Sequence, residues 1–366
     1  MNFKAIEFLR TIASLGVVWV HLWAGSFSKM PLNVCGLDVY KAISFVGNGV
    51  DFFFVISGFL MYLALYSKKL TLNSYFYFVK KRFYRIAPLY YSAILIYFVY
   101  YKFVDHRDIG WNAVLINASF LNNHFGINIA YTFWSMAVEW LFYLIIPLLF
   151  VFEDYKRQMW VFWTLEVVSL IRLYQIESLQ VLHTVPNMPM PFFVEFGWGI
   201  LMAMILTKNN WKDKFVVKQT WLNLCFGFGL LYLGRIMRMT QVVEWAGEFS
   251  IVVKLMSGPI LTFGFAFIMF MLIRENGIFS IFVEHHVFQF LGKCSYGIYL
   301  WHVLIIELTE GLFDINGGPG ALILAFLLVV GLSIILSWLT YELIEKLYFK
   351  SKFSNKYNDE KLHLNE

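Results

Sequence analysis

Two ionisable side chains, Arg10 and His21, lie eleven residues apart within the apolar stretch FLRTIASLGVVWVHLWAG. On a helix that spacing is three turns plus about 20°, so both side chains lie on one face, about 16 Å apart along the axis. Ionisable groups are costly in a bilayer, and histidine is a natural general base near neutral pH. The structural alternative is that Arg10 snorkels to lipid headgroups and His21 bonds a neighbouring helix.

Two carboxylates fall at a similar predicted depth to His21. Asp51 lies near the start of GNGVDFFFVISGFLMYL, and Glu139 lies about two turns into TFWSMAVEWLFYLIIPLL. A buried carboxylate needs a cation or several hydrogen-bond donors. We therefore expect His21, Asp51 and Glu139 to share a polar site in which one of the acids orients the histidine.

A basic segment at residues 67–85 lies just before Pro88, in KKRFYRIAPLYY. Arg82 and Arg85 are three residues apart, so on a helix they share a face. Guanidinium groups pair bidentately with phosphate, which makes these two arginines a candidate phosphate clamp. The alternative is an anchor on anionic lipid. We expect Arg10, His302 (in LGKCSYGIYLWHVLII) and Glu345 to line a cytoplasmic vestibule with these two arginines. Taken singly, each of these residues is explained equally well by a structural ion pair.

The composition predicts that these residues lie on membrane helices. The chain has 366 residues, of which 60% are hydrophobic and 14% charged, against about 45–50% and about 25% in soluble domains. Apolar stretches of about 20 residues recur along the whole chain. We predict an all-α polytopic membrane protein with about ten transmembrane helices, at residues 6–26, 44–66, 86–104, 131–152, 158–176, 191–207, 220–239, 250–273, 296–313 and 320–341.

The basic residues predict the orientation of these helices. With the N-terminus in the cytoplasm, 20 of the 29 Lys and Arg residues fall on the cytoplasmic side and seven on the outer side. This asymmetry favours cytoplasmic N- and C-termini and an even number of spans. We expect one membrane-embedded domain at residues 1–346 and a polar cytoplasmic tail at residues 347–366.

Composition also limits the partners. Three scattered cysteines, Cys35, Cys225 and Cys294, are too few for a disulfide framework or a metal site. The net charge of +5 does not suggest nucleic acid, because basic residues in a membrane protein mainly report topology. The predicted partner is the lipid bilayer, and the sequence leaves the oligomeric state undetermined.

Five segments in this order resemble the acyltransferase 3 family of integral membrane O-acyltransferases. They are FLRTIASLGVVWVHL, GVDFFFVISGFL, RFYRIAPLY, FWSMAVEWLFYLIIPL and SYGIYLWH, followed by the acidic YELIEK. The resemblance covers residues 8 to 346, nearly the whole chain. Each segment alone is weak, but the ordered set is highly specific.

The resemblance implies ten membrane helices and an acyl-CoA donor, most simply acetyl-CoA, used from the cytoplasm. The acceptor it implies is a hydroxyl of an envelope or extracellular polysaccharide or glycolipid. By resemblance, His21 matches the essential histidine, Arg10 its arginine partner, and Glu139 the acid of the Trp-Ser motif. Arg82 and Arg85 match the basic motif thought to hold the CoA phosphates. The family also implies a plasma (inner) membrane location, in a bacterium.

The sequence departs from the family pattern at two positions. Met136 stands where leucine is frequent, and Trp140 stands where a second polar residue often follows the glutamate, which leaves Glu139 as the main acid there. Some members carry a fused soluble esterase-like domain. None is visible in this chain, so we expect it to act alone or to hand its acyl group to a separate polysaccharide-biosynthesis partner.

Membrane transport and a scaffolding role are the two alternatives to acyl transfer. Proton-coupled transporters and glycolipid translocators also use intramembrane His, Asp and Glu. Such proteins often show internal repeats or broken helices in matching halves, and this sequence shows neither. A non-catalytic scaffold is the third possibility, and it leaves the buried ionisable groups without a use.

The outer segment DHRDIGWNAVLINASFLNNHFGINIA is the candidate acceptor-binding loop. Trp111, Asn112, Asn122, Asn123 and His124 have side chains that stack on sugars or hydrogen-bond to them. The same residues also suit an interfacial re-entrant helix. Both interpretations remain open from the sequence.

Overall fold

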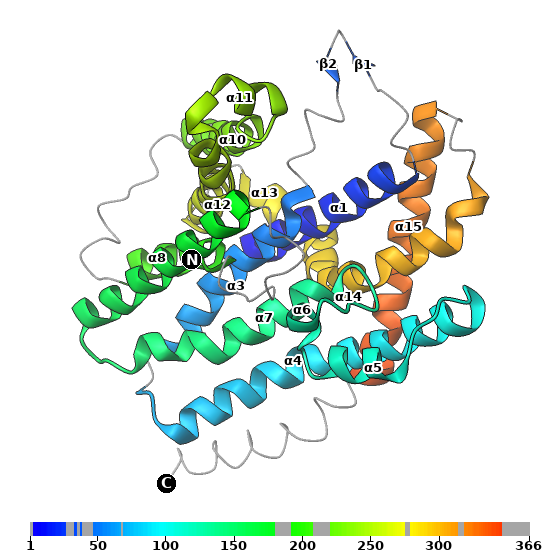
Figure 1. Ribbon diagram of the computed structural model, residues 1–366, viewed down its shortest axis with the longest axis horizontal. Helices are drawn as coiled ribbons and strands as arrows, with labels where there is room; N and C mark the ends of the chain where they lie inside the picture. The colour runs from blue at the N-terminus through cyan, green and yellow to red at the C-terminus, as the bar shows by residue number, and fades with distance from the viewer. Residues whose placement is uncertain are drawn as a thin grey trace.

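The structure, a computed structural model, is a bundle of helices in which α1 (Lys4–Ser26) lies near the centre (Figure 1). It describes residues 3–26, 33–34, 37–38, 47–66, 69–179, 192–207, 220–274, 279–313 and 318–345. The predicted tail and the boundary at residue 346 lie outside this part of the chain. Figure 1 shows α14 (His286–Thr309) and α15 (Gly318–Thr340) on one side of α1, with α8 (Tyr155–Leu179), α10 (Thr220–Ile236) and α12 (Ser250–Arg274) on the other.

The remaining elements complete the bundle. The other α-helices are α3 (Gly49–Leu65), α4 (Leu72–Val99), α5 (Trp111–Ala118), α6 (Asn122–Phe125), α7 (Phe133–Ile145), α9 (Phe193–Thr207), α11 (Thr240–Trp245) and α13 (Phe279–Val283). Short 3₁₀ and π segments are η2 (Tyr100–Val104), η3 (Ile146–Phe150), η5 (Gly247–Phe249), η6 (Glu310–Leu312) and η7 (Tyr341–Glu345). The strands β1 (Asn33–Val34) and β2 (Leu37–Asp38) pair antiparallel, with Asn33 opposite Asp38.

The multi-pass membrane character agrees with the sequence. Each predicted span falls on a helix of the bundle, and five helical segments of the described chain are long and apolar enough to cross a membrane: Lys4–Trp23, Leu72–Val104, Phe133–Phe150, Gly247–Arg274 and Gly320–Leu343. Three shorter helical segments are also apolar: Gly49–Leu65, Phe193–Thr207 and Trp221–Ile236. The total of ten spans and the cytoplasmic termini remain predictions.

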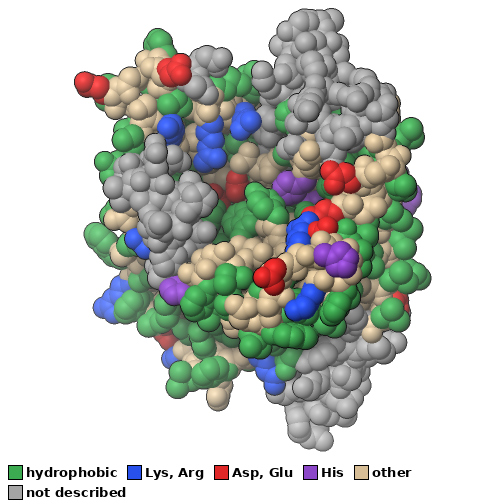
Figure 2. Space-filling view, turned by 45° about the vertical axis from the view of Figure 1, so that its right-hand side comes forward, with side chains coloured by type: hydrophobic (Ala, Val, Ile, Leu, Met, Phe, Trp, Pro, Cys, Tyr) green, Lys and Arg blue, Asp and Glu red, His purple; other side chains and the backbone are tan. Residues whose placement is uncertain are grey.

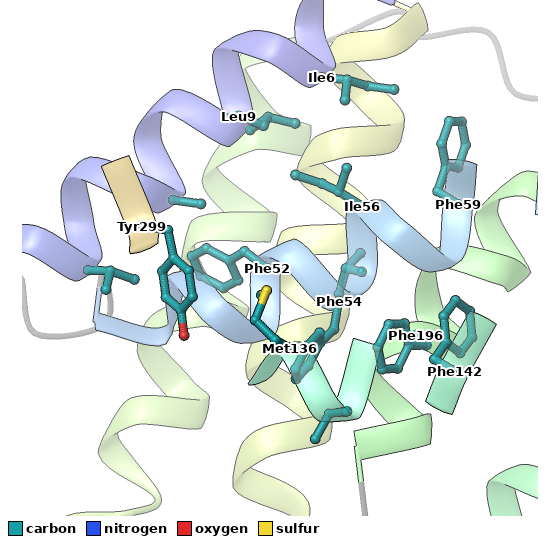
Figure 3. Close-up of a cluster of buried hydrophobic side chains, with 14 of the residues drawn as sticks. Ile6, Leu9, Phe52, Phe54, Ile56, Phe59, Met136, Phe142, Phe196 and Tyr299 are labelled. Carbon is teal, nitrogen blue, oxygen red and sulfur yellow. The ribbon is translucent and has the colours of Figure 1, made fainter. Parts of the chain in front are cut away.

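Close packing of α3 on α9 forms the centre of the apolar core. Figure 3 shows Phe54, Phe142 and Phe196 meeting there, and the rings of Phe142 and Phe196 stack with centroids 3.8 Å apart. A Cβ at Gly58 would collide with the backbone carbonyl of Phe196, and one at Gly199 would collide with the carbonyl of Val55. Small residues at these two positions let the backbones touch, as is typical of membrane helix pairs.

Replacing Gly58 with alanine is therefore expected to destabilise the bundle. Two backbones must separate to admit the new methyl group, a strain of about 1–3 kcal/mol. Thermal unfolding of the detergent-purified protein should show a lower midpoint. Gly331→Ala in α15 is the matched control, since a Cβ there meets nothing within 4 Å. Equal midpoints for the two variants would contradict the close contact.

The start of α4 differs from the prediction. Residues 72–85 were expected in a basic loop ahead of a span beginning at residue 86, but the helix begins at Leu72 and passes through Pro88. Thr71 starts it with a capping box in which its side chain and that of Ser74 each accept a backbone hydrogen bond. Proline inside a membrane helix is tolerated because neighbouring groups can satisfy the freed backbone groups. One turn further along α4, Ser92 Oγ donates to the carbonyl of Pro88 at 2.8 Å. Arg82 and Arg85 consequently project from a helix.

The segment after η2, predicted to lie on the outer side, folds into the short helices α5 and α6. Asn122 and Asn123 are buried, and their side-chain amides donate to the carbonyls of Phe133 and Trp134 at 3.1 and 2.7 Å. These two asparagines therefore tie the segment to α7 and do not form an open sugar-binding surface. Trp111 is 64% exposed, which suits an interfacial helix.

Candidate active site

One cavity, which we call the arginine cavity, lies between α1, α3, α4, α7 and α14. Its volume is about 120 Å³, room for several water molecules. Along α3 its lining runs from Val50 to Met61, which is about 16 Å of helix. The polar residues that line it are Arg10, Ser57, Arg82, Arg85, Ser135, Glu139, Tyr143, Tyr296 and Tyr299.

Three guanidinium groups and one carboxylate give the arginine cavity an excess of positive charge. Arg10, Arg82 and Arg85 come together here, as the sequence led us to expect. Arg10 also forms an ion pair with Glu7 at 3.6 Å. Among the described residues, the buried Nε of Arg82 has no hydrogen-bond partner. An unpaired buried donor beside two further cations suits an anionic ligand.

Glu139 is the carboxylate of this cavity. Its Oε1 accepts hydrogen bonds from the hydroxyls of Ser57, at 3.3 Å, and Tyr143. The charges of Arg10 and Arg85 act on it favourably. Glu139 therefore has the donors and cations that a buried carboxylate needs.

A second cavity, which we call the lysine cavity, adjoins the first at Arg82. Its volume is about 270 Å³. Lys69 and Lys81 line it beside Ser74 and Tyr77, and Arg82 lines both cavities. The two spaces therefore share one guanidinium group, with cations on either side of it.

His21 makes its polar contact with His302. The Nδ1 of His21 lies 2.8 Å from the Nε2 of His302, and the two ring planes are parallel to within 3°. His302 is completely buried, whereas His21 is partly exposed. The ring of Tyr131, a residue that is 67% exposed, meets the His21 ring edge-on with centroids 5.4 Å apart. The expectation that Asp51 or Glu139 hydrogen-bonds His21 is wrong, because a second histidine has that position.

The position of His302 follows from where α14 begins. The sequence placed it about two turns into a span starting at residue 296, beside the arginines. The helix instead begins at His286, so His302 lies about 24 Å along it. Helices α1 and α14 run parallel, because Gln289 bonds the carbonyl of Lys4 near their starts and His302 meets His21 near their ends. His302 accordingly does not line the arginine cavity.

Asp51 belongs to a different polar group. Its Oδ2 accepts from the side-chain amide of Asn48 at 2.6 Å, and it interacts electrostatically with Arg238 and Glu195. It is not among the residues that line the arginine cavity. The three groups predicted at one depth therefore occupy three separate settings.

Tyr299, with Ser135 bonded to it, lies between the cavity and His302, and the sequence alone did not indicate this position. The two hydroxyls lie 2.7 Å apart and both residues line the arginine cavity. The Tyr299 ring also lies beside the His302 ring, with centroids 5.8 Å apart. The only sequence signal was the position of Tyr299 one helical turn before His302.

Charged side chains also gather on the molecular surface. Figure 2 shows a face hollowed near its middle, where hydrophobic side chains form the floor and acidic, basic and histidine side chains lie around them. In the described part of the chain, no group of three His, Cys, Asp or Glu residues is arranged to hold a metal ion.

These features define a multi-pass helical membrane protein with a cationic cavity beside a histidine pair. The chain belongs to the acyltransferase 3 family, since the family profile described as an acyltransferase domain matches residues 3–342. The chain is accordingly an acyl-transferring enzyme. A transporter or translocator is not favoured by this match.

Two similar proteins have acetyltransferase in their names. The ORF330 protein of the Acidianus two-tailed virus, whose name assigns it as an acetyltransferase, is 31% identical over 315 residues, covering 82% of each chain. The O-acetyltransferase OatA of Staphylococcus aureus is 23% identical over 363 residues, covering 93% of this chain and 56% of its own length. No solved structure is a significant match.

Proposed function

We propose that the protein is a membrane O-acyltransferase that moves an acetyl group from acetyl-CoA to a hydroxyl of a cell-envelope or extracellular polysaccharide or glycolipid. The arrangement of the two cavities carries this proposal. A basic lysine cavity and the arginine cavity meet at Arg82, whose buried Nε has no partner among the described residues. The cations that line these two spaces suit a donor with a phosphorylated head.

In this proposal Arg82 and Arg85 hold phosphate groups of the donor, and Arg10 lines the same cavity. The 16 Å or so that the arginine cavity extends along α3 is comparable with an extended pantetheine arm. The thioester then lies at the end lined by Ser135 and Tyr299. We infer that these hydroxyls move apart when donor and acceptor are both bound, because Tyr299 separates the cavity from His302.

His21 acts as the general base on the acceptor hydroxyl. It is partly exposed beside the exposed Tyr131, and it is not among the residues that line the arginine cavity. The acceptor and the donor would thus approach the reaction centre from different sides. The predicted orientation puts the donor on the cytoplasmic side and the acceptor on the outer side.

The experiment that tests the proposal is transfer of radiolabelled acetyl from acetyl-CoA to carbohydrate in membrane vesicles from producing cells. Vesicles with the wild-type protein should label a carbohydrate fraction, and the label should be released by mild alkali, as expected of an ester. Vesicles without the protein provide the background. Labelling no higher than that background would overturn the proposal.

Glu139→Gln is expected to lower the rate of this transfer more than Asp51→Asn. Glu139 lies among the arginines and accepts from two hydroxyls, whereas Asp51 contacts Asn48 outside the cavity. Losing a charged hydrogen-bond acceptor raises the activation free energy of the transfer by about 1.5 kcal/mol, which lowers kcat about tenfold. Steady-state rates of the two variants check this. A larger loss from Asp51→Asn would show that the acids have the opposite importance.

A further inference from the structure

We propose that His302 is a positioning residue, one that fixes the tautomer of His21 so that Nε2 of His21 receives the proton of the acceptor. This rests on the proposed function of His21 as a general base. It goes beyond that function because it assigns the proton-accepting nitrogen and a role for a buried histidine outside the donor cavity.

The Nδ1 atom of His302 faces two backbone carbonyl groups. It lies 2.7 Å from the carbonyl oxygen of Tyr299 and 3.3 Å from that of Ile298. A carbonyl oxygen only accepts, so Nδ1 of His302 carries the hydrogen. In the described structure, the hydrogen-bond contacts of this ring are these carbonyls and His21. A completely buried imidazole without a carboxylate in contact is neutral, since an unpaired charge is costly there.

The tautomer of His302 determines which nitrogen of His21 carries the hydrogen. A neutral His302 with hydrogen on Nδ1 has its lone pair on Nε2, the atom 2.8 Å from Nδ1 of His21. The ring planes are parallel to within 3° and the centroids are 5.1 Å apart, so the two nitrogens point at each other in a common plane. Nδ1 of His21 must therefore donate this hydrogen bond. The lone pair of neutral His21 is left on Nε2.

The proton balance of the transfer uses this arrangement. The acceptor oxygen forms a bond to the acyl carbon, and its proton passes to Nε2 of His21. The carbon–sulfur bond breaks, and the thiolate takes a proton from His21 and leaves as the thiol. His302 stays neutral throughout. Its Nε2 accepts from the transient imidazolium of His21 through the existing hydrogen bond, a stabilisation that strengthens as the charge develops.

Two substitutions separate this role from simple packing. His302→Phe fills the space without an acceptor, whereas the amide oxygen of His302→Gln accepts a hydrogen bond from Nδ1 of His21. We expect His302→Phe to lower kcat about 100-fold, while the affinity for acetyl-CoA is unchanged. His302→Gln should recover at least about tenfold of that loss. Rescue by an acceptor, together with a loss in kcat alone, is not expected of a packing role.

The controls use the same helix. His286→Phe makes the same change at an exposed position at the start of α14 and should leave transfer at the wild-type rate. Acetyl-CoA binding and gel filtration of the purified variants establish that they fold. If His302→Phe does not fold, His302→Leu takes its place.

The rates of these variants separate failure of the positioning role from failure of the proposed function. A wild-type kcat in His302→Phe or His302→Leu would overturn the inference, as would a His302→Gln variant that is as slow as His302→Phe. If wild-type vesicles transfer no acetyl group, the proposed function fails first and this inference fails with it. A loss with His21→Ala but none with His302→Phe would leave the proposed function standing and remove only the positioning role.

Discussion

Replacing His21 with alanine is expected to reduce acetyl transfer by a factor of about 10²–10⁴, the usual contribution of a general base. The reason is geometric: His21 is the partly exposed member of the histidine pair, and its Nε2 atom is left to take a proton from a hydroxyl. The affinity for acetyl-CoA should be unchanged, because His21 does not line the arginine cavity.

The measurement for His21→Ala is the initial rate of label transfer in vesicles, paired with acetyl-CoA binding to the purified variant. His286→Ala is the control, since it removes an exposed histidine at the start of α14. An unchanged rate in a folded His21→Ala variant would remove the histidine from the chemistry. Loss of donor affinity would instead mean that the thioester binds closer to His21 than proposed.

Replacing Arg82 with alanine is expected to weaken acetyl-CoA binding about 30-fold, because a charge-assisted hydrogen bond to phosphate contributes about 2 kcal/mol. Arg82 should have a larger effect than Arg85, since Arg82 lines both cavities and Arg85 lines one. The double variant should bind more weakly than either single variant.

Equilibrium binding of acetyl-CoA to the detergent-purified protein checks the Arg82 prediction. Lys80→Ala is the matched control: it removes a cation from the same helix, but Lys80 is exposed and lines neither cavity. A salt-dependent loss with Arg82→Ala and not with Lys80→Ala is the expected pattern. Equal affinities for wild type and Arg82→Ala would exclude the phosphate clamp.

Much of the fold was predictable, since long apolar stretches have few alternatives in a bilayer. Each predicted span coincides with a helix. The boundaries were less accurate where a signal was ambiguous. The span was predicted to begin at residue 86, after the basic segment, yet α4 begins at Leu72, where the capping box of Thr71 and Ser74 determines the first turn. Local capping chemistry, rather than hydropathy, defined that end.

The site was predictable only in part. The spacing of Arg82 and Arg85 indicated a shared face, and the structure brings both to one cavity with Arg10 and Glu139. The pairing of His21 with His302 was not predictable, because it depends on which helices are parallel neighbours and on where α14 begins. Depth along the membrane suggested a contact between His21 and Asp51, but depth says nothing about which direction around the bundle a side chain faces.

We propose that this chain adds acyl groups to envelope carbohydrate and uses His21 to do so. The most direct measurement is mass spectrometry of O-acyl groups on envelope glycans from cells with wild-type protein, with His21→Ala or with no protein. We predict an additional acyl mass, most simply acetyl, in the wild-type sample alone, on a hydroxyl of a polysaccharide or glycolipid. Identical O-acyl content in all three samples would contradict the account.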